Sequence, residues 1–423
     1  MSQNFDIPAG YRELAAPDLI ALVAETPDLA ARLGGAAQDW RCDEISDGNM
    51  NAVWRLAGPA GAIVAKQALP YIRVIGEGWP FPVSRAEYEH RALVDHGRAA
   101  PGVPPRVHAY RPDLALIFME ALQPHVVARA GFVAGRRFPT LARDLGLYLA
   151  RSLVGTSDLV LTTAAKNALV DRYSGNAELC ATTQDVVFTG PYHEAPLNRL
   201  TPGQEGLAAQ LRGDSALRLA AMEMKHAFRS QAEALIHGDL HTGSLMLSAD
   251  ETRVIDPEWA FVGPMGFDIG AVLGNLWLAA FSQPGHATAA DDRQEMTAWL
   301  LNVAEEAWAT FVEEATRLAH PRPGGLIETE VAGDGVGQAF VAARLAAVWR
   351  DTLGFAGAKM IRRILGISHV ADFEEIADIP TRAACEARAL RMARHLLLNR
   401  AALRSPSEVS DLARDIAQGR RQV

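Results

Sequence analysis

A stretch near the middle of the chain sets a high density of acids beside short apolar runs. Residues 235–270, LIHGDLHTGSLMLSADETRVIDPEWAFVGPMGFDIG, contain two histidines, four aspartates and two glutamates. The pattern predicts a tight loop around Asp239, then a strand at residues 253–255 that ends just before Asp256 and Glu258. Two short strands that deliver acids to the same end can build a metal and phosphate site, because Mg²⁺ binds carboxylate and phosphate oxygens. A salt-bridged structural cap is the alternative.

The three acids have different expected tasks in such a site. Asp239 can orient a hydroxyl nucleophile. Asp256 and Glu258 stand two residues apart, so they can face one metal ion if the backbone between them is extended.

Composition narrows the class of protein. The 423 residues are 49% hydrophobic and 22% charged, as in folded globular chains, and the length suggests two or three domains. A formal net charge of -9 disfavours nucleic acid or an anionic membrane as the main partner. Cys42, Cys180 and Cys385 lie far apart, which indicates neither disulfides nor a zinc site and fits a cytoplasmic protein.

The hydropathy of the chain does not indicate a membrane protein. The first residues contain acids and no apolar segment, so we expect no secretory signal. The longest apolar stretch, residues 269–281, is too short to cross a bilayer and contains Asn275. We expect a buried helix there.

The first third of the chain reads as strands followed by a helix. Residues 40–46 and 52–58 predict a hairpin with its tip at Gly48, and residues 61–69 predict a third strand. A helix should begin at a Ser84 cap and end at Gly97, and residues 113–122 form an apolar run of strand length.

The rest of the chain is mostly helical in pattern. Asp214 is a candidate N-cap, residues 183–213 read as a loop, and residues 376–423 read as helical. The fold class is therefore α+β, with a small strand-rich lobe, residues 1–122, and a larger helical lobe, residues 123–423.

The order of these parts resembles that of the protein kinases. In that order a lysine on the third strand neutralises nucleotide phosphates and is held by a helix glutamate. Lys66 is the only lysine in the first 160 residues, and Glu87 or Glu89 would hold it. The turn DGNMN, residues 47–51, would cover the phosphates, and the backbone of residues 119–121 would meet adenine.

The chain also departs from the protein kinases. Ser244 stands where a metal-binding asparagine is expected, and Asp256-Pro257-Glu258 replaces Asp-Phe-Gly. The motif HGDLH followed by a small residue is instead similar to that of the aminoglycoside and choline kinase-like enzymes, which phosphorylate small hydroxylated molecules.

Longer segments resemble the 5-methylthioribose kinases of methionine salvage. The matching segments are DGNMN (47–51), KQALPYIR (66–73), GEGWP (76–80), HGDLHTGS (237–244), DPEWAFVGPMGFDIG (256–270) and IRRILGISHVADFE (361–374). The resemblance thus covers most of the chain, and it implies a protein-kinase-like two-lobe fold and a homodimer.

The resemblance also implies roles for individual residues. ATP, the co-substrate, would be bound by Asp47, Gly48, Asn49, Lys66, Glu89, Met119, Glu120 and Ala121. Asp256 and Glu258 would hold Mg²⁺, and Asp239 would be the catalytic base or orienter of the substrate hydroxyl. The substrate would be bound by Asn51, Trp79, Asp239, Arg362 and Arg363, with the loop around Trp79 closing near it. The 1-hydroxyl of 5-methylthioribose would receive the γ-phosphoryl group.

Other residues have supporting or open roles. His237 is expected to pack under the loop that carries Asp239, and Asp268 to accept backbone N–H groups of that loop. His241 could meet substrate or metal. The arginine pair 362–363 could instead be one solvated and one structural residue.

Two alternatives remain open from the sequence. The chain could phosphorylate another sugar, an amino alcohol or an aminoglycoside. Ser244 and the single glycine of DGNMN also allow a pseudokinase that binds nucleotide without transferring phosphate.

Overall fold

A computed structural model describes residues 5, 7–45, 50–73 and 76–420. By packing, the chain divides into two compact units. The first consists of Met1–Pro124 with Arg253–Ala260, and the second of His125–Thr252 with Phe261–Val423. The lobes expected at 1–122 and 123–423 remain a prediction about domain organisation, and the packing units differ from them chiefly because Arg253–Ala260 packs with the first unit.

The first unit is built on a five-stranded sheet in the order β1-β2-β3-β7-β6, with every neighbouring pair antiparallel. Its strands are β1 (Arg41–Glu44), β2 (Asn51–Gly58), β3 (Gly61–Ala68), β7 (Leu116–Glu120) and β6 (Val107–Arg111). The expected hairpin is confirmed, since Arg41 to Glu44 pair with Ala57 to Trp54. The tip predicted at Gly48 lies outside the described residues.

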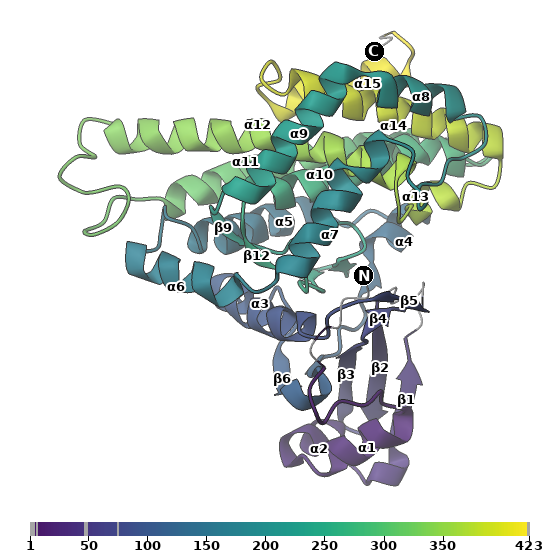
Figure 1. Ribbon diagram of the computed structural model, residues 1–423, viewed down its shortest axis with the longest axis vertical. Coiled ribbons are helices and arrows are strands. Elements are labelled where there is room, and N and C mark those ends of the chain that lie inside the picture. Colours follow the sequence, from purple (N-terminus) through teal and green to yellow (C-terminus); the bar gives the residue numbers. More distant parts are fainter. Residues whose placement is uncertain (1–4, 6, 46–49, 74–75, 421–423) are drawn as a thin grey trace. The chain divides into compact units, whose positions relative to one another are not determined.

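Two short helices, α1 (Ala16–Ala24) and α2 (Pro27–Leu33), pack on this sheet (Figure 1). Their apolar residues join those of β2, β3 and β7 in one core cluster, which includes Leu19, Leu33, Leu56, Ile63 and Phe118. This core fixes β3, and so holds the backbone of its lysine in place.

Two boundaries predicted in the first unit differ from the structure, and its remaining elements complete the picture. They are the 3₁₀ turns η1 (Ala37–Asp39) and η2 (Pro112–Leu114), the strands β4 (Tyr71–Ile72) and β5 (Gly76–Pro80), and the helix α3 (Arg85–Ala99). The predicted end of the helix at Gly97 is wrong by two residues, because the helical backbone continues through it to Ala99. The apolar run from residue 113 begins as a 3₁₀ turn, so β7 starts only at Leu116.

The second unit is mostly helical, with α10 (Met265–Ser282) at its centre. Every residue of α10 is buried, which confirms the expected buried helix, and α10 packs against α12 (Val336–Leu365) (Figure 1). Close packing needs glycine here: a Cβ on Gly270 would lie 2.5 Å from the carbonyl oxygen of Thr352. The length expected from residues 269–281 is wrong, because the helical segment Met265–His286 is long and apolar enough to cross a membrane; its most apolar window is wholly buried inside the structure, as in many core helices.

Short strands position the loop that carries Asp239. β9 (Ala234–Ile236) pairs with β12 (Phe261–Gly263), and β10 (Leu245–Leu247) pairs with β8 (Val126–Val127). Residues 237–244 connect β9 to β10. β11 (Thr252–Val254) follows, at the position expected from the sequence to within one residue, and it crosses from the second unit into the first.

Several helices surround this centre. They are α4 (Ala128–Val133), α5 (Leu141–Leu149), the π-helix η3 (Ala150–Val154), α6 (Thr163–Tyr173), α7 (Ala177–Phe188), η4 (Gly190–Tyr192), α8 (Glu205–Gly213), α9 (Ser215–Ser230), η5 (Gln283–His286), α11 (Gln294–Leu318), α13 (Ala371–Glu374), α14 (Ile379–Asn399) and α15 (Pro406–Ala417). Asp214 caps α9 as expected, accepting from the N–H groups of Ala216 and Leu217. The helical C-terminal region is likewise confirmed by α14 and α15.

The loop predicted at residues 183–213 is wrong at both ends. Thr183 lies inside α7, and α8 occupies Glu205–Gly213. Both helices are short and bury only a few apolar residues each, among them Phe188 and Leu211. The connection between them is polar and rich in proline, and it makes the whole stretch resemble a loop in the sequence.

Candidate active site

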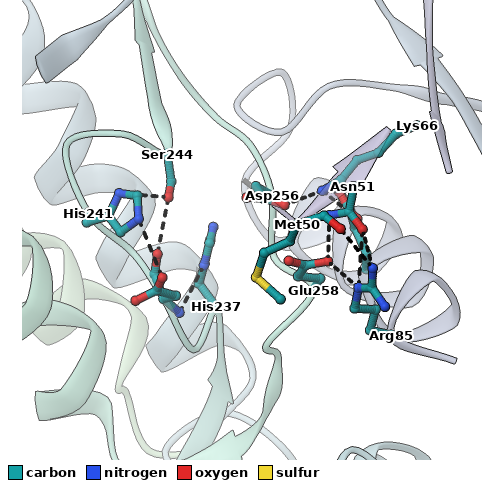
Figure 2. A network of polar contacts seen from close by, with 11 residues as sticks. Met50, Asn51, Lys66, Arg85, His237, His241, Ser244, Asp256 and Glu258 are labelled. Carbon is teal, nitrogen blue, oxygen red and sulfur yellow. Dashed lines mark hydrogen bonds and ion pairs between the residues drawn. The ribbon is translucent and has the colours of Figure 1, made fainter. Parts of the chain in front are cut away.

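The expected site residues that the structure describes gather mainly in two clusters, one in each unit. In the first unit, Lys66 on β3 donates from Nζ to Glu89 on α3, at 2.8 Å from Oε1 and 2.7 Å from Oε2. The same ammonium pairs with Asp256 (Figure 2). Glu87, the other candidate, pairs instead with Arg91 at the surface. The structure therefore pairs the lysine with Glu89.

Charge and burial in this cluster oppose each other. Burial disfavours the ammonium of Lys66, but Asp256 and Glu89 outweigh it and raise the pKa of Lys66 above its ordinary value. Burial raises the pKa of Glu89, with Lys66 opposing. Burial also raises the pKa of Glu258, and the nearby Asp256 adds to this. A further positive charge placed among these acids would be favourable.

Glu258 is held by a network that the sequence did not reveal. Its Oε2 accepts from Asn51 Nδ2 at 2.8 Å and from Arg85 Nε at 3.2 Å (Figure 2). Arg85 is fully buried in the first turn of α3, and its guanidinium also donates to the carbonyl oxygens of Leu69 and Pro82. The only sequence signal for Arg85 was its place four residues before Glu89 on a predicted helix.

The carboxylates of this cluster fit a metal ion in chemistry and spacing. One oxygen each from Glu89, Asp256 and Glu258 lie within 4.8 Å of one another. Oxygen donors of this kind suit Mg²⁺. The side chain of Asp256 is 45% exposed, whereas that of Glu258 is 2% exposed, so Asp256 is the more accessible of the two expected ligands.

The sequence allowed Asp256 and Glu258 to face one metal ion if the backbone between them were extended, and the backbone at Asp256 does not meet that condition. Asp256 has a φ of 69°, in the left-handed region that few residues other than glycine adopt. Such conformations persist where the surrounding structure enforces them, often at functional sites. The two carboxylates approach one another through this turn and not through strand geometry.

The other first-unit residues expected to bind ATP or substrate lie in or near β2, β5 and β7, apart from three that the structure does not describe. Asp47, Gly48 and Asn49 lie outside the described residues. Met119 is buried on β7, Glu120 at its end accepts from Arg253 Nη2 at 2.7 Å, and Ala121 follows it. Asn51 is 4% exposed, and its amide contacts Glu258 and Arg85. Trp79, expected in a loop, is a half-buried residue of β5.

In the second unit, Asp268 of α10 anchors the loop that carries Asp239. Its Oδ2 accepts from the backbone N–H of His237 at 2.6 Å, and its Oδ1 accepts from that of Gly238 at 3.0 Å. Gly238 has a φ of 85°, which favours glycine at this turn. His237 is fully buried beneath the loop. These contacts are the ones expected for Asp268 and His237.

Asp239 itself is surrounded by cationic groups. Its Oδ1 accepts from Lys359 Nζ at 2.6 Å, and Arg363 Nη2 lies 3.8 Å from Oδ2. Burial alone would raise the pKa of Asp239, but Lys359, with help from His241 and Arg363, holds it well below its ordinary value. The carboxylate is therefore ionised at neutral pH, and it is set to accept a hydrogen bond.

His241 acts within this cluster as a neutral ring. Burial, aided by Arg363, lowers the pKa of His241 to about 3 against the pull of Asp239. Its Nδ1 accepts from the backbone N–H of Gly243 at 2.9 Å, which leaves the proton on Nε2, 3.4 Å from Asp239 Oδ2. Ser244 Oγ donates to the carbonyl oxygen of Asp239 at 3.1 Å and lies 3.3 Å from His241 (Figure 2).

Arg362 and Arg363, on α12, are both buried with donors to spare. Among the described residues, Nε and Nη1 of Arg362 and Nε and Nη2 of Arg363 have no hydrogen-bond partner. Burial lowers the pKa of both, yet a guanidinium does not lose its proton in proteins. Unused, buried guanidinium donors are suited to an anionic group of a ligand. The reading of one arginine as solvated is wrong, since both are buried.

Lys359 is a residue of this cluster that sequence reasoning missed, as are Arg129 and Asp372 nearby. It is 2% exposed and lies in a part of α12 where every residue from Thr352 to Leu365 is buried. The chain has only four lysines. A lone lysine within the apolar stretch GFAGAKMIRR was the available signal, because an unpaired ammonium is costly to bury.

The sequence of the chain matches proteins of known function. A model of the phosphotransferase enzyme family matches residues 41–308. Methylthioribose kinase 1 of Oryza sativa subsp. japonica is 42% identical over 95% of this chain and 94% of its own length. The methylthioribose kinase of Escherichia coli O45:K1 (strain S88 / ExPEC) is 38% identical over 93% of this chain and 95% of its own. The chain belongs to the methylthioribose kinase family.

Solved structures are similar at lower identity. A choline kinase from Cryptosporidium parvum Iowa II is 10% identical with a TM-score of 0.45, covering 94% of this chain and 100% of that one. A choline/ethanolamine kinase family protein from Mesorhizobium loti is 13% identical with a TM-score of 0.43, covering 95% of this chain and 99% of that one. The methylthioribose kinase family membership confirms the resemblance and the fold class expected from the sequence.

Proposed function

We propose that this protein transfers the γ-phosphoryl group of ATP to the 1-hydroxyl of 5-methylthioribose, giving 5-methylthioribose 1-phosphate and ADP. The observation that carries the proposal is the state of Asp239. Its loop is anchored by Asp268, and its carboxylate is ionised and held by Lys359. The methylthioribose kinases of Oryza sativa subsp. japonica and Escherichia coli support the substrate, since they align with nearly the whole chain.

Asp239 has two tasks in this reaction, which are to orient the sugar hydroxyl and to accept its proton. Its carboxylate accepts the hydrogen bond of the sugar hydroxyl and aims the oxygen at the γ-phosphorus. The new O–P bond forms while the bond to the β,γ-bridging oxygen breaks and ADP leaves. Asp239 receives the hydroxyl proton. Positioning and charge neutralisation supply most of the rate enhancement in such transfers.

The first-unit cluster suits the ATP phosphates and their metal. Lys66 supplies a fixed positive charge for phosphate oxygens, and Glu89 holds it. Asp256 and Glu258 would hold Mg²⁺, which when bound neutralises charge on the phosphate oxygens. Arg85 and Asn51 keep the Glu258 carboxylate in one orientation.

The charges around Asp239 favour a neutral acceptor over a cationic one. Lys359, Arg362 and Arg363 are buried near this carboxylate, and Arg129 pairs with Asp372 close by. Cations outnumber acids in this cluster. A protonated amino alcohol or aminoglycoside would be repelled there, whereas a neutral thiosugar would not. The free donors of Arg362 and Arg363 could then meet the transferring phosphoryl group.

ADP release by purified protein with ATP and Mg²⁺ tests the proposal. 5-Methylthioribose, ribose, choline and kanamycin are added in turn, and Asp239→Asn is the control. We expect turnover with 5-methylthioribose, and ³¹P NMR of the product should show a phosphate on carbon 1. Turnover only with another compound would reject the substrate, and ATP binding without any turnover would reject the kinase. The homodimer and the cytoplasmic location stay predictions, for sedimentation and cell fractionation to test.

A further inference from the structure

Lys359 has a geometry that a merely structural lysine does not need. Its side chain lies in a wholly buried part of α12, with Nζ 2.6 Å from Asp239 Oδ1 and 4.8 Å from the ring centroid of Phe267. Replacing a buried ion pair by apolar residues of similar volume is often neutral or stabilising. An ammonium in this position is therefore better explained by what it does to Asp239 than by stability.

The contacts of the Asp239 carboxylate divide between its two oxygens. Oδ1 has the short bond from Lys359. Among the residues that the structure describes, Oδ2 has only longer contacts, 3.4 Å to His241 Nε2 and 3.8 Å to Arg363 Nη2. With Oδ1 held, the carboxylate cannot rotate freely, and Oδ2 is the oxygen left to accept a hydroxyl hydrogen bond.

We propose that Lys359 is a positioning residue for phosphoryl transfer, which fixes the Asp239 carboxylate by Oδ1 so that Oδ2 receives the acceptor hydroxyl. This inference rests on the proposed kinase function. Lys359 acts through Asp239, so its contribution exists only while Asp239 is present as a carboxylate. Loss of the ammonium should slow the chemical step and leave ATP binding by the first unit intact.

A pH effect follows from the same contact. The titratable and charged groups around Asp239 are Lys359, Arg362 and Arg363 of α12, Asp268 of α10 and the neutral His241 of its own loop, with Arg129 of α4 and Asp372 of α13 next to Arg363. Lys359 is the largest of the influences that lower the pKa of Asp239. Removing its charge should let burial raise that pKa, and the acid limb of the rate profile should move to higher pH.

The test is a double-mutant cycle. Lys359→Met keeps the volume and removes the charge, and it is combined with Asp239→Asn. The matched control is Lys166→Met, another buried lysine, which lies on α6 and donates to the carbonyl oxygen of Glu233. For each variant, kcat, the KM values for ATP and 5-methylthioribose, the pH profile and Tm are measured.

We expect Lys359→Met to lose about 100-fold in kcat, the scale of a misplaced catalytic group, with KM for ATP within about threefold of wild type. The double variant should be no slower than Asp239→Asn within about threefold, since residues that act as a unit are not additive. Lys359→Arg should recover part of the rate. Lys166→Met should retain kcat even if its Tm falls.

Distinct outcomes would overturn the inference. Three results would each reject the positioning role without rejecting the kinase function. They are a wild-type kcat in Lys359→Met, an equal fold loss when Lys359→Met is added to Asp239→Asn, and an acid limb of the Lys359→Met pH–rate profile at the same pH as in wild type. If Lys359→Met does not fold, the cycle with Lys359→Arg is judged by the same additivity criterion. Absence of turnover in the wild-type protein would instead reject the proposed function, and this inference with it.

Discussion

Asp268 on α10 accepts a 2.6 Å hydrogen bond from the backbone N–H of His237, and thereby ties the loop of Asp239 to the central helix of the second unit. The same carboxylate accepts from Gly238 through its other oxygen. Both donors are buried backbone groups, which lose free energy if they are left without a partner. The position of Asp239 thus depends on a residue that need not touch any substrate.

Replacing Asp268 by asparagine should lower kcat strongly. The amide keeps one acceptor oxygen but turns an NH₂ group toward the second backbone N–H, which costs about 1–3 kcal/mol. We expect kcat to fall roughly 10- to 100-fold as the loop loosens. Steady-state kinetics with ATP binding by calorimetry would check this. An unchanged kcat would show that the loop holds its shape without the anchor.

The pairing of Lys66 with Glu89 predicts a difference between two neighbouring glutamates. Glu89→Gln removes a charge that holds the lysine, so KM for ATP should rise about tenfold. Glu87→Gln is the matched control, because Glu87 pairs with Arg91 at the surface, where ion pairs contribute little. Initial rates over a range of ATP concentrations give KM for ATP in both variants and in the wild type. Equal effects of the two substitutions would contradict the assigned pairing.

The acids of the first unit predict a requirement for a divalent metal. Treatment with EDTA should abolish turnover, and added Mg²⁺ should restore it. Asp256→Asn should lower kcat by about 1,000-fold, on the scale of lost charge stabilisation in phosphoryl transfer. Asp250→Asn, at an exposed acid of the turn that precedes β11, should leave kcat within about twofold. Full activity in EDTA would rule out the metal site.

A stability prediction concerns Glu314 on α11, away from the candidate site. Hydrogen bonds from Arg317 lower its pKa to about 2 against burial, and Arg151 adds to this. Because the folded pKa is depressed, this stabilisation is complete above the unfolded pKa of about 4.3 and is lost as pH falls toward 2.

Glu314→Gln should therefore lower the free energy of unfolding by about 1 kcal/mol at pH 7, a modest figure because Arg317 is largely exposed. The difference from wild type should shrink below about pH 4.3. Urea unfolding at pH 7 and pH 3.5 measures both, with exposed Glu313→Gln as control. A difference that stays constant with pH would mean that the ion pairs do not stabilise the fold.

The sequence by itself determined the parts and their order. Each of these parts is formed by consecutive residues, so local periodicity and turn chemistry predict it. They include the strands around Lys66, the tight loop of Asp239, the acids after β11 and the buried helix α10. Helix α8 and the second half of α7 were missed, because both helices are short, bury few apolar side chains and flank a connection rich in proline and polar residues.

Only the tertiary structure decided which of these parts meet. Lys66 pairs with Glu89 and not with Glu87, because Glu89 lies on the face of α3 that packs inward. The same packing places Arg85 against Glu258. It set Lys359 against Asp239, which lies 120 residues away. Such contacts depend on how a buried helix face is rotated and packed against a distant loop. A local pattern of residues carries no record of that choice, since burial and charge pairing are settled only when the whole core forms.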